Sequence, residues 1–161
     1  MPNECVFSAD RRYRYTLIHR WDELLNPAHG IAWICLNPST ADENQLDPTL
    51  RRIRAFSAAW GYSYFVMLNL FAWRATLPAD MKRAPDPVGS DNDHWIAHWA
   101  GRVDRVMLGW GEHGAHLTRD RAVLKILDAR KTFCLDRNAS SQPKHPLYVA
   151  KTTPPIRFAE Q

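Results

Sequence analysis

Three polar motifs in this 161-residue chain carry side chains that could act on a base or a sugar, and the first begins at Asn37. The Asn37 amide could orient a water molecule or read a base, and Ser39 and Thr40 could donate to phosphate or sugar oxygens. Pro38 forces a turn here, because proline excludes the helical region for the residue before it. The alternative is that Asn37 and Ser39 only satisfy the backbone groups of that turn.

The second motif covers residues 69–74. Asn69 interrupts an apolar run, so its buried amide needs partners, and the Watson–Crick edge of a base would provide them. Phe71 or Trp73 could stack on a base, and Arg74 could hold a phosphate. The alternative pairs Asn69 with a neighbouring loop and places both aromatic rings in the core.

The third motif is His145, which follows Lys144 and precedes Pro146 in a polar loop. A histidine here could stabilise developing negative charge as a neutral donor, or it could carry a proton. The alternative is a surface histidine next to a turn proline.

Metal and cofactor motifs are weak in this sequence. The pairs His94/His98 and His113/His116 have the spacing of two metal ligands, but no carboxylate or cysteine is spaced to complete a shell. Glycine-rich phosphate loops of the Walker or Rossmann type are absent, which argues against an ATP- or NAD-dependent enzyme. We therefore expect neither a metal nor a cofactor. The arginines at 51, 52 and 54 are either a phosphate-contacting face or a solvated helix surface.

The elements that must position these motifs alternate between strands and helices. Apolar runs predict inner strands at residues 31–36, 64–70 and 103–108 and a short final strand at residues 132–135. Residues 12–21 alternate as a half-exposed strand does, and this strand could be an antiparallel edge. Asp47 and Pro48 read as an N-cap and first turn of a helix that ends at Gly61. Further helices are predicted from Ser90 and within residues 118–130.

This alternation predicts an α/β fold, a three-layer sandwich around a central, mainly parallel sheet. Ligands of open α/β sheets bind outside the carboxyl ends of the strands. The segments at those ends are residues 37–44, 69–76, 109–114 and 136–148, and we expect them to form one site.

Composition indicates one domain over residues 1–161, with residues 1–12 and 155–161 peripheral. Three scattered cysteines predict no disulfide framework, and neither a signal peptide nor a membrane-spanning run is present, so we expect a cytoplasmic protein. The net charge of +4 suits a phosphate-bearing partner such as DNA, RNA or a nucleotide. We expect no membrane partner.

The motifs together resemble a bacterial and phage family, domain-of-unknown-function family 1643. The segments that carry this resemblance are Leu36–Asp42, Asp47–Thr49, Asn69–Ala72, Arg74–Thr76, Trp110–Gly111 and His145–Tyr148. More distantly, their order is similar to that of the uracil-DNA glycosylase superfamily. Ser39 stands here in place of a glycine of that superfamily, and Leu147 and Tyr148 stand in place of its Ser-Pro.

The distant resemblance implies a uracil-DNA glycosylase-like fold that hydrolyses N-glycosidic bonds without metal or cofactor. It implies that Asn37 orients water with Asp42 as a possible base, that Asn69 reads the base, that His145 stabilises the departing oxygen, and that Leu147 enters the base stack. The catalytic candidates are thus Asn37, Asp42 and His145, and the base- or nucleotide-binding candidates are Pro38, Ser39, Thr40, Asn69, Phe71, Arg74, Trp110, Lys144 and Leu147.

Two other readings stay open at this point. The chain could be a non-catalytic module that binds nucleic acid or a nucleotide, or an interaction protein of a phage or mobile element whose site is vestigial. Whether it is an enzyme is therefore open.

Overall fold

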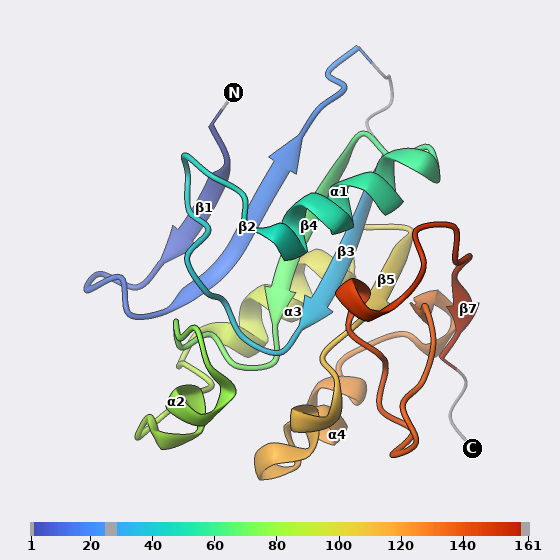
Figure 1. Cartoon of the computed structure of the whole chain (residues 1–161). Coiled ribbons are helices and arrows are strands. Elements are labelled where there is room, and N and C mark those ends of the chain that lie inside the picture. Colours follow the sequence, from blue (N-terminus) through green and yellow to red (C-terminus); the bar gives the residue numbers. More distant parts are fainter. Residues whose placement is uncertain (1, 25–28, 159–161) are drawn as a thin grey trace.

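The computed structural model describes residues 2–24 and 29–158. Within them lies a seven-stranded sheet in the order β1-β2-β4-β3-β5-β6-β7 (Figure 1). The strands are β1 (Glu4–Phe7), β2 (Arg14–Arg20), β3 (Gly30–Cys35), β4 (Tyr64–Asn69), β5 (Arg105–Leu108), β6 (Thr132–Cys134) and β7 (Ile156–Arg157). The α-helices are α1 (Pro48–Ala59), α2 (Pro78–Arg83), α3 (Asn92–Ala100) and α4 (Arg119–Leu124), and the 3-10 helices are η1 (Glu112–Thr118), η2 (Ala129–Lys131) and η3 (Pro146–Tyr148).

The sheet is mixed, which corrects the expectation of a mainly parallel one. Strands β4, β3, β5 and β6 run parallel, whereas β1 with β2, β2 with β4, and β6 with β7 are antiparallel. A short turn, closed by the bond from Ser8 N to Tyr13 O at 3.0 Å, joins β1 to β2, and such a turn can only reverse the chain. Strand β2 is antiparallel as expected but is not an edge, because β1 covers it.

Side-chain capping sets the start of α1. Asp47 caps this helix by accepting from Leu50 N at 2.9 Å, and proline occupies the first turn. Helix α3 follows Ser90 as predicted, but its N-cap Asp91 makes no side-chain capping bond. Helix α4 lies within the predicted 118–130 range, and the positive φ of Leu117 and Thr118 separates it from η1.

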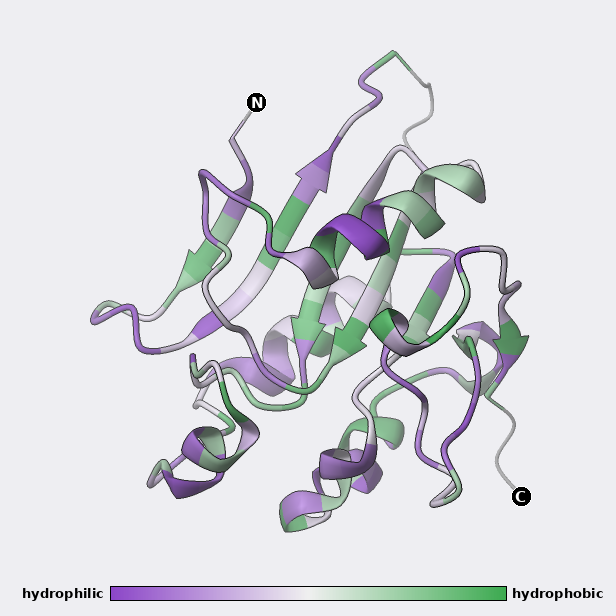
Figure 2. Ribbon diagram, in the orientation of Figure 1, coloured by the Kyte–Doolittle hydropathy of each residue, from purple (hydrophilic) through white to green (hydrophobic). Residues whose placement is uncertain are grey.

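Helices cover both faces of the sheet, giving three layers (Figure 1). On one face, α1 packs Leu50, Ile53 and Phe56 against the side chains of β3 and β4. On the other, α2, α3 and α4 contribute Met81, Ile96 and Val123 to a second core cluster. The inner strands are apolar along most of their length, and polar residues concentrate in the connecting segments (Figure 2). No described helix is long and apolar enough to cross a membrane.

Backbone hydrogen bonds bring the segments that follow the parallel strands together. Leu70 N donates to Cys35 O at 2.9 Å, and Gly109 N donates to Ile34 O at 2.9 Å, so the ends of β4 and β5 flank the end of β3. Beyond the strands, Ala75 N donates to Pro38 O at 3.0 Å. The expected gathering of strand-end loops is therefore present at this edge of the sheet.

Candidate functional site

A cavity of about 680 Å³ opens at this edge of the sheet, between the strand ends and the start of α1. Asn37 and His145, two of the three key residues expected to converge, both line it. Its apolar walls include Leu50 and Met67. The predicted residues that also line it are Pro38, Ser39, Thr40, Trp110 and Leu147.

Asn37 is held so that its side-chain oxygen remains free to accept. The amide nitrogen Nδ2 donates to Ala75 O at 2.8 Å and to Pro38 O at 3.1 Å. Both amide hydrogens are thus used by the backbone, as the turn alternative anticipated, but Oδ1 keeps its acceptor capacity. In a cavity wall, that oxygen can orient a water molecule or accept from a ligand.

His145 presents a neutral donor to the same cavity. Its Nδ1 accepts from Leu147 N at 3.2 Å, so the proton of the neutral ring lies on Nε2. Burial lowers the pKa of His145, and the carboxylate of Asp47 opposes this only in part. The ring is therefore uncharged at neutral pH and can donate from Nε2.

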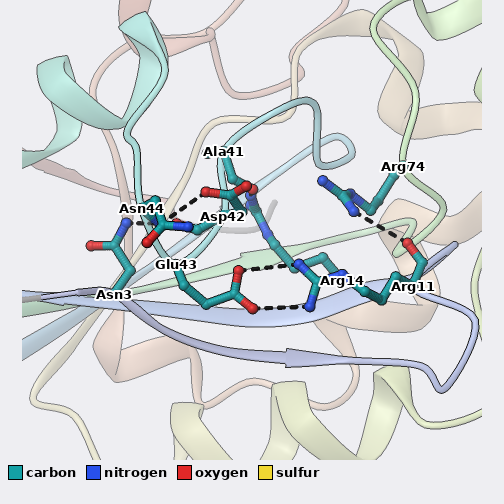
Figure 3. A network of polar contacts seen from close by, with 8 residues as sticks. All are labelled: Asn3, Arg11, Arg14, Ala41, Asp42, Glu43, Asn44 and Arg74. Carbon is teal, nitrogen blue, oxygen red and sulfur yellow. Dashed lines mark hydrogen bonds and ion pairs between the residues drawn. The ribbon is translucent and has the colours of Figure 1, made fainter.

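The acidic residues that line the cavity are Asp47 and Glu112, and Asp42 lies outside the lining. Asp42 accepts from Asn44 N through Oδ1 at 2.9 Å, while its backbone oxygen accepts from Asn3 Nδ2 at 2.7 Å (Figure 3). Asp47 is the N-cap of α1, and the Asp-Pro signal in the sequence marks its position. That signal indicated a helix start and gave no hint that the carboxylate faces a site.

Asn69 is buried in the sheet and does not line the cavity, with 1 % of its surface exposed. Within the described part of the chain, neither Oδ1 nor Nδ2 has a hydrogen-bond partner. Side chains alternate along β4, so Asn69 shares the α1 face of the sheet with Met67, which lines the cavity. The expected neighbouring-loop partner for the amide is not found there.

Arg14, which sequence reasoning missed, lines the cavity from β2. Its side chain is 1 % exposed, and Nη1 donates to Ala41 O at 2.9 Å. The residue reads in the sequence as one polar position of an alternating strand, and such positions usually face solvent. A register shift in the β1–β2 ladder, between Val6 and Phe7, disturbs that alternation beside Arg14.

Besides Asn69, three further residues predicted to bind a base or nucleotide lie outside the cavity lining. Phe71 is fully buried in the core cluster on the opposite face, so its ring cannot stack on a ligand in this conformation. Arg74 is outside the cavity lining, and Lys144 forms an ion pair with Asp136 at 3.4 Å. Their chemistry fitted the roles assigned to them, but the sequence does not show which way each side chain points.

An open groove adjoins the cavity and shares Ser39, Thr40, Ala75 and Thr76 with it. Three arginines line this groove: Arg11, Arg12 and Arg74. Arg11 is held by Glu43 through two bonds of 2.9 and 3.1 Å, and this pairing is the main cause that lowers the pKa of Glu43 to about 2 (Figure 3). Arg74 donates to the Arg11 backbone at 3.3 Å and has no carboxylate partner in the described residues.

Histidine pairs do not form metal centres in the described residues, where no group of three potential ligands gathers. His94 and His98 are ring neighbours on α3, with centroids 6.1 Å apart.

The three arginines of α1 have different surroundings. Arg52 donates to Val149 O at 2.8 Å and so ties the helix to the segment after His145, whereas Arg51 and Arg54 are exposed.

Comparison with known proteins identifies the family. The sequence model described as "Protein of unknown function (DUF1643)" matches residues 14–147, and the chain belongs to that family. Neither a curated protein nor a solved structure matches.

Proposed function

We propose that this member of the DUF1643 family binds a nucleoside unit, in nucleic acid or free, and hydrolyses its N-glycosidic bond. One observation carries the proposal: one cavity is lined both by Asn37, whose Oδ1 keeps its acceptor capacity, and by His145, whose Nε2 carries the proton of the neutral ring. Base excision of this kind needs an oriented water and stabilisation of the leaving base, and it needs no metal. A likeness to uracil-DNA glycosylases in motif order agrees with this chemistry.

The reaction assigns one role to each polar group. Asn37 orients a water whose oxygen bonds to the anomeric carbon while the bond from that carbon to the base nitrogen breaks. Asp47 takes the proton of this water, a role that we assign to it instead of Asp42 because Asp47 lines the cavity. The base leaves as an anion with the bonding electron pair, and the neutral ring of His145 donates a hydrogen bond from Nε2 to it and keeps its proton.

The thiol of Cys35 takes no part in this scheme. It lines the cavity, but burial raises its pKa and keeps it protonated. A thiol in this state is a poor nucleophile, so the scheme contains no covalent enzyme intermediate.

Release of free base tests the proposal. Purified protein is incubated with nucleosides and single- and double-stranded oligonucleotides of varied base, and released base is measured by chromatography. We expect Asn37→Ala to lower the rate about 100-fold or more, on the scale of losing one positioned polar group. Asn44→Ala, an asparagine outside the cavity lining, is the matched control.

Asp47 allows a sharper separation of catalysis from folding. Serine is as good an N-cap as aspartate, so Asp47→Ser keeps the cap of α1 but removes the carboxylate. We expect a Tm near that of the wild type together with loss of base release. Full activity of Asn37→Ala and Asp47→Ser, or release by neither variant nor wild type, removes the catalytic claim.

A second function is favoured by the arginine-lined groove beside the cavity. The same surface supports a module that binds nucleic acid or a nucleotide without turnover. That version predicts binding that weakens with salt, because arginine contacts to phosphates displace counterions. The two versions share the cavity and differ in whether base is released.

A further inference from the structure

Arg14 is a buried cation that forms no ion pair in the described residues, although the carboxylate of Asp47, which also lines the cavity, acts on it electrostatically. Its side chain makes one hydrogen bond, to the carbonyl of Ala41, and no described carboxylate lies within 4.0 Å. Nε has neither a partner nor accessible surface. Burial lowers the pKa of Arg14 to about 10, so the guanidinium still carries its charge at neutral pH. Buried charges in proteins are normally paired, and this one faces a cavity.

Asn69 adds a second unsatisfied group from the neighbouring strand. Strands β2 and β4 are adjacent in the sheet, and Asn69 stands opposite the cavity-lining Cys35 in the β3–β4 register. Both atoms of its amide head are buried without partners. Unsatisfied buried polar groups are costly, and of these two residues only Arg14 lines the cavity, so Arg14 is the one whose hydrogen bonds a ligand there can complete.

The surroundings of Arg14 suit the edge of a flat ring better than a phosphate. The walls of the cavity that Arg14 lines include Leu50, Met67 and Trp110, which are apolar or aromatic, besides its polar residues. The open groove with its three arginines is the better place for phosphates, since it remains solvated. A base in the cavity and phosphates in the groove would match both surfaces at once.

A guanidinium distinguishes bases by their acceptors. Nη1 of Arg14 gives one of its two hydrogens to Ala41 O, and Nη2 has no described partner, so the Nη1–Nη2 end of the guanidinium can still donate to two acceptors. Arginine pairs best with two adjacent acceptors, such as O6 and N7 of guanine. Adenine places an amino donor where guanine has O6, so a guanidinium meets a donor there.

We propose that Arg14 is the specificity-determining residue of the cavity and selects 6-oxopurine bases, guanine and hypoxanthine. The inference rests on the proposed function and names the class of base for that site.

Calorimetric titration of the whole chain with guanosine, inosine, adenosine, uridine and inorganic phosphate tests the inference. We expect guanosine and inosine to bind about 10- to 100-fold more tightly than adenosine or uridine. Arg14→Met, which keeps the size of the side chain, should abolish this preference. Arg102→Met replaces a surface arginine at the end of α3 and should leave it unchanged.

Two further measurements exclude a purely structural role for Arg14. An unpaired buried charge destabilises the fold, so the Tm of Arg14→Met should equal or exceed that of the wild type. Arg14→Lys keeps the charge but lacks the planar guanidinium with its paired donors, and it too should lose the preference for oxopurines. A large drop in Tm for Arg14→Met, with the preference retained by Arg14→Lys, overturns the inference.

The titrations separate this inference from the function on which it rests. Equal affinity of the wild type for guanosine and adenosine removes the base selection but leaves the nucleoside site intact. Binding of inorganic phosphate that competes with guanosine and depends on Arg14 also overturns the base-edge assignment. Absence of any nucleoside binding removes the proposed function and the inference together.

Discussion

His145 depends on being neutral, and its surroundings keep it so. Nδ1 is occupied as an acceptor by Leu147 N, and burial lowers the pKa of the ring. A protonated ring would lose this contact, since both nitrogens of the imidazolium are donors. The geometry that places a donor on Nε2 therefore also makes this turn sensitive to acid.

Replacing His145 with glutamine should weaken the dependence of stability on pH. Below about pH 6.5 the unfolded chain protonates this ring while the folded chain does not, so the unfolded state binds more protons. Stability linked to His145 is thus complete above that pH and is lost as the pH falls through the lowered folded pKa. Thermal melts at pH 7.5 and pH 5 give the Tm difference between wild type and His145→Gln at each pH. From pH 7.5 to pH 5 the Tm of the wild type should fall more than the Tm of His145→Gln. An equal Tm difference between the two proteins at both pH values contradicts the role of His145.

At the scale of elements, α1 contributes to the site at two points along the helix. Asp47 at its start lines the cavity, and Arg52 in its first turns donates to Val149 O at 2.8 Å. The turn η3 contains Leu147, and it lies between His145 and Val149 in the sequence. The His145 segment is therefore fastened to the helix by a charged hydrogen bond.

Removal of that bond should loosen the turn. Arg52→Met leaves the Val149 carbonyl without its donor and should cost about 1 kcal/mol of stability, given partial exposure. Hydrogen exchange of the Tyr148 amide, which donates to His145 O at 3.0 Å, should become faster. Arg51→Met, at the exposed neighbouring position of the helix, is the control. Equal exchange rates in both variants would show that Arg52 does not hold the turn.

The sequence predicted the inner elements because their signals are local. Apolar runs marked β3 and β4, and Asp47-Pro48 marked the start of α1. The edge strands carry no such signal: β1 has four residues and β7 has two, and both depend on pairing with a neighbour. Pairing between distant segments is a tertiary property, so the mixed character of the sheet was not predictable from local pattern.

The site divides in the same way. Asn37 and His145 lie in loops that follow strands. The order of the strands in the sheet is enough to bring such loops together, so their place in the cavity was predictable. Arg14 and Asp47 were missed as cavity residues because their directions depend on an irregular β-ladder and on a helix cap. Phe71 was a candidate for stacking on a base because it follows a strand, but its ring is part of the core.

At the scale of the whole molecule, positive charge is concentrated where the cavity meets the groove. The chain carries a net charge of +4, and Arg11, Arg12 and Arg74 line the groove. Arg11 is paired with Glu43 and Arg12 with Asp10, which leaves Arg74 as the arginine of the groove without a described carboxylate partner. A phosphate backbone that leaves the cavity would contact Arg74.

Salt dependence of nucleic-acid binding should report that contact. Arg74→Ala should weaken oligonucleotide binding and reduce the slope of log affinity against log salt by about 1. Arg83→Ala, an arginine of α2 paired with Asp80, is the control and should leave the slope unchanged. An affinity that is insensitive to salt in the wild type would exclude the groove as a phosphate path.

Nuclear magnetic resonance tests the central claim most directly. Nitrogen-15-labelled protein is titrated with guanosine, and the side-chain amides of Asn37 and Asn69 and the ring of His145 are followed. We expect saturable shifts at Asn37 and His145, which line the cavity, and a smaller change at Asn69, which is buried outside the lining. Shifts confined to other surfaces, or no shifts at millimolar nucleoside, would show that this cavity does not receive a base.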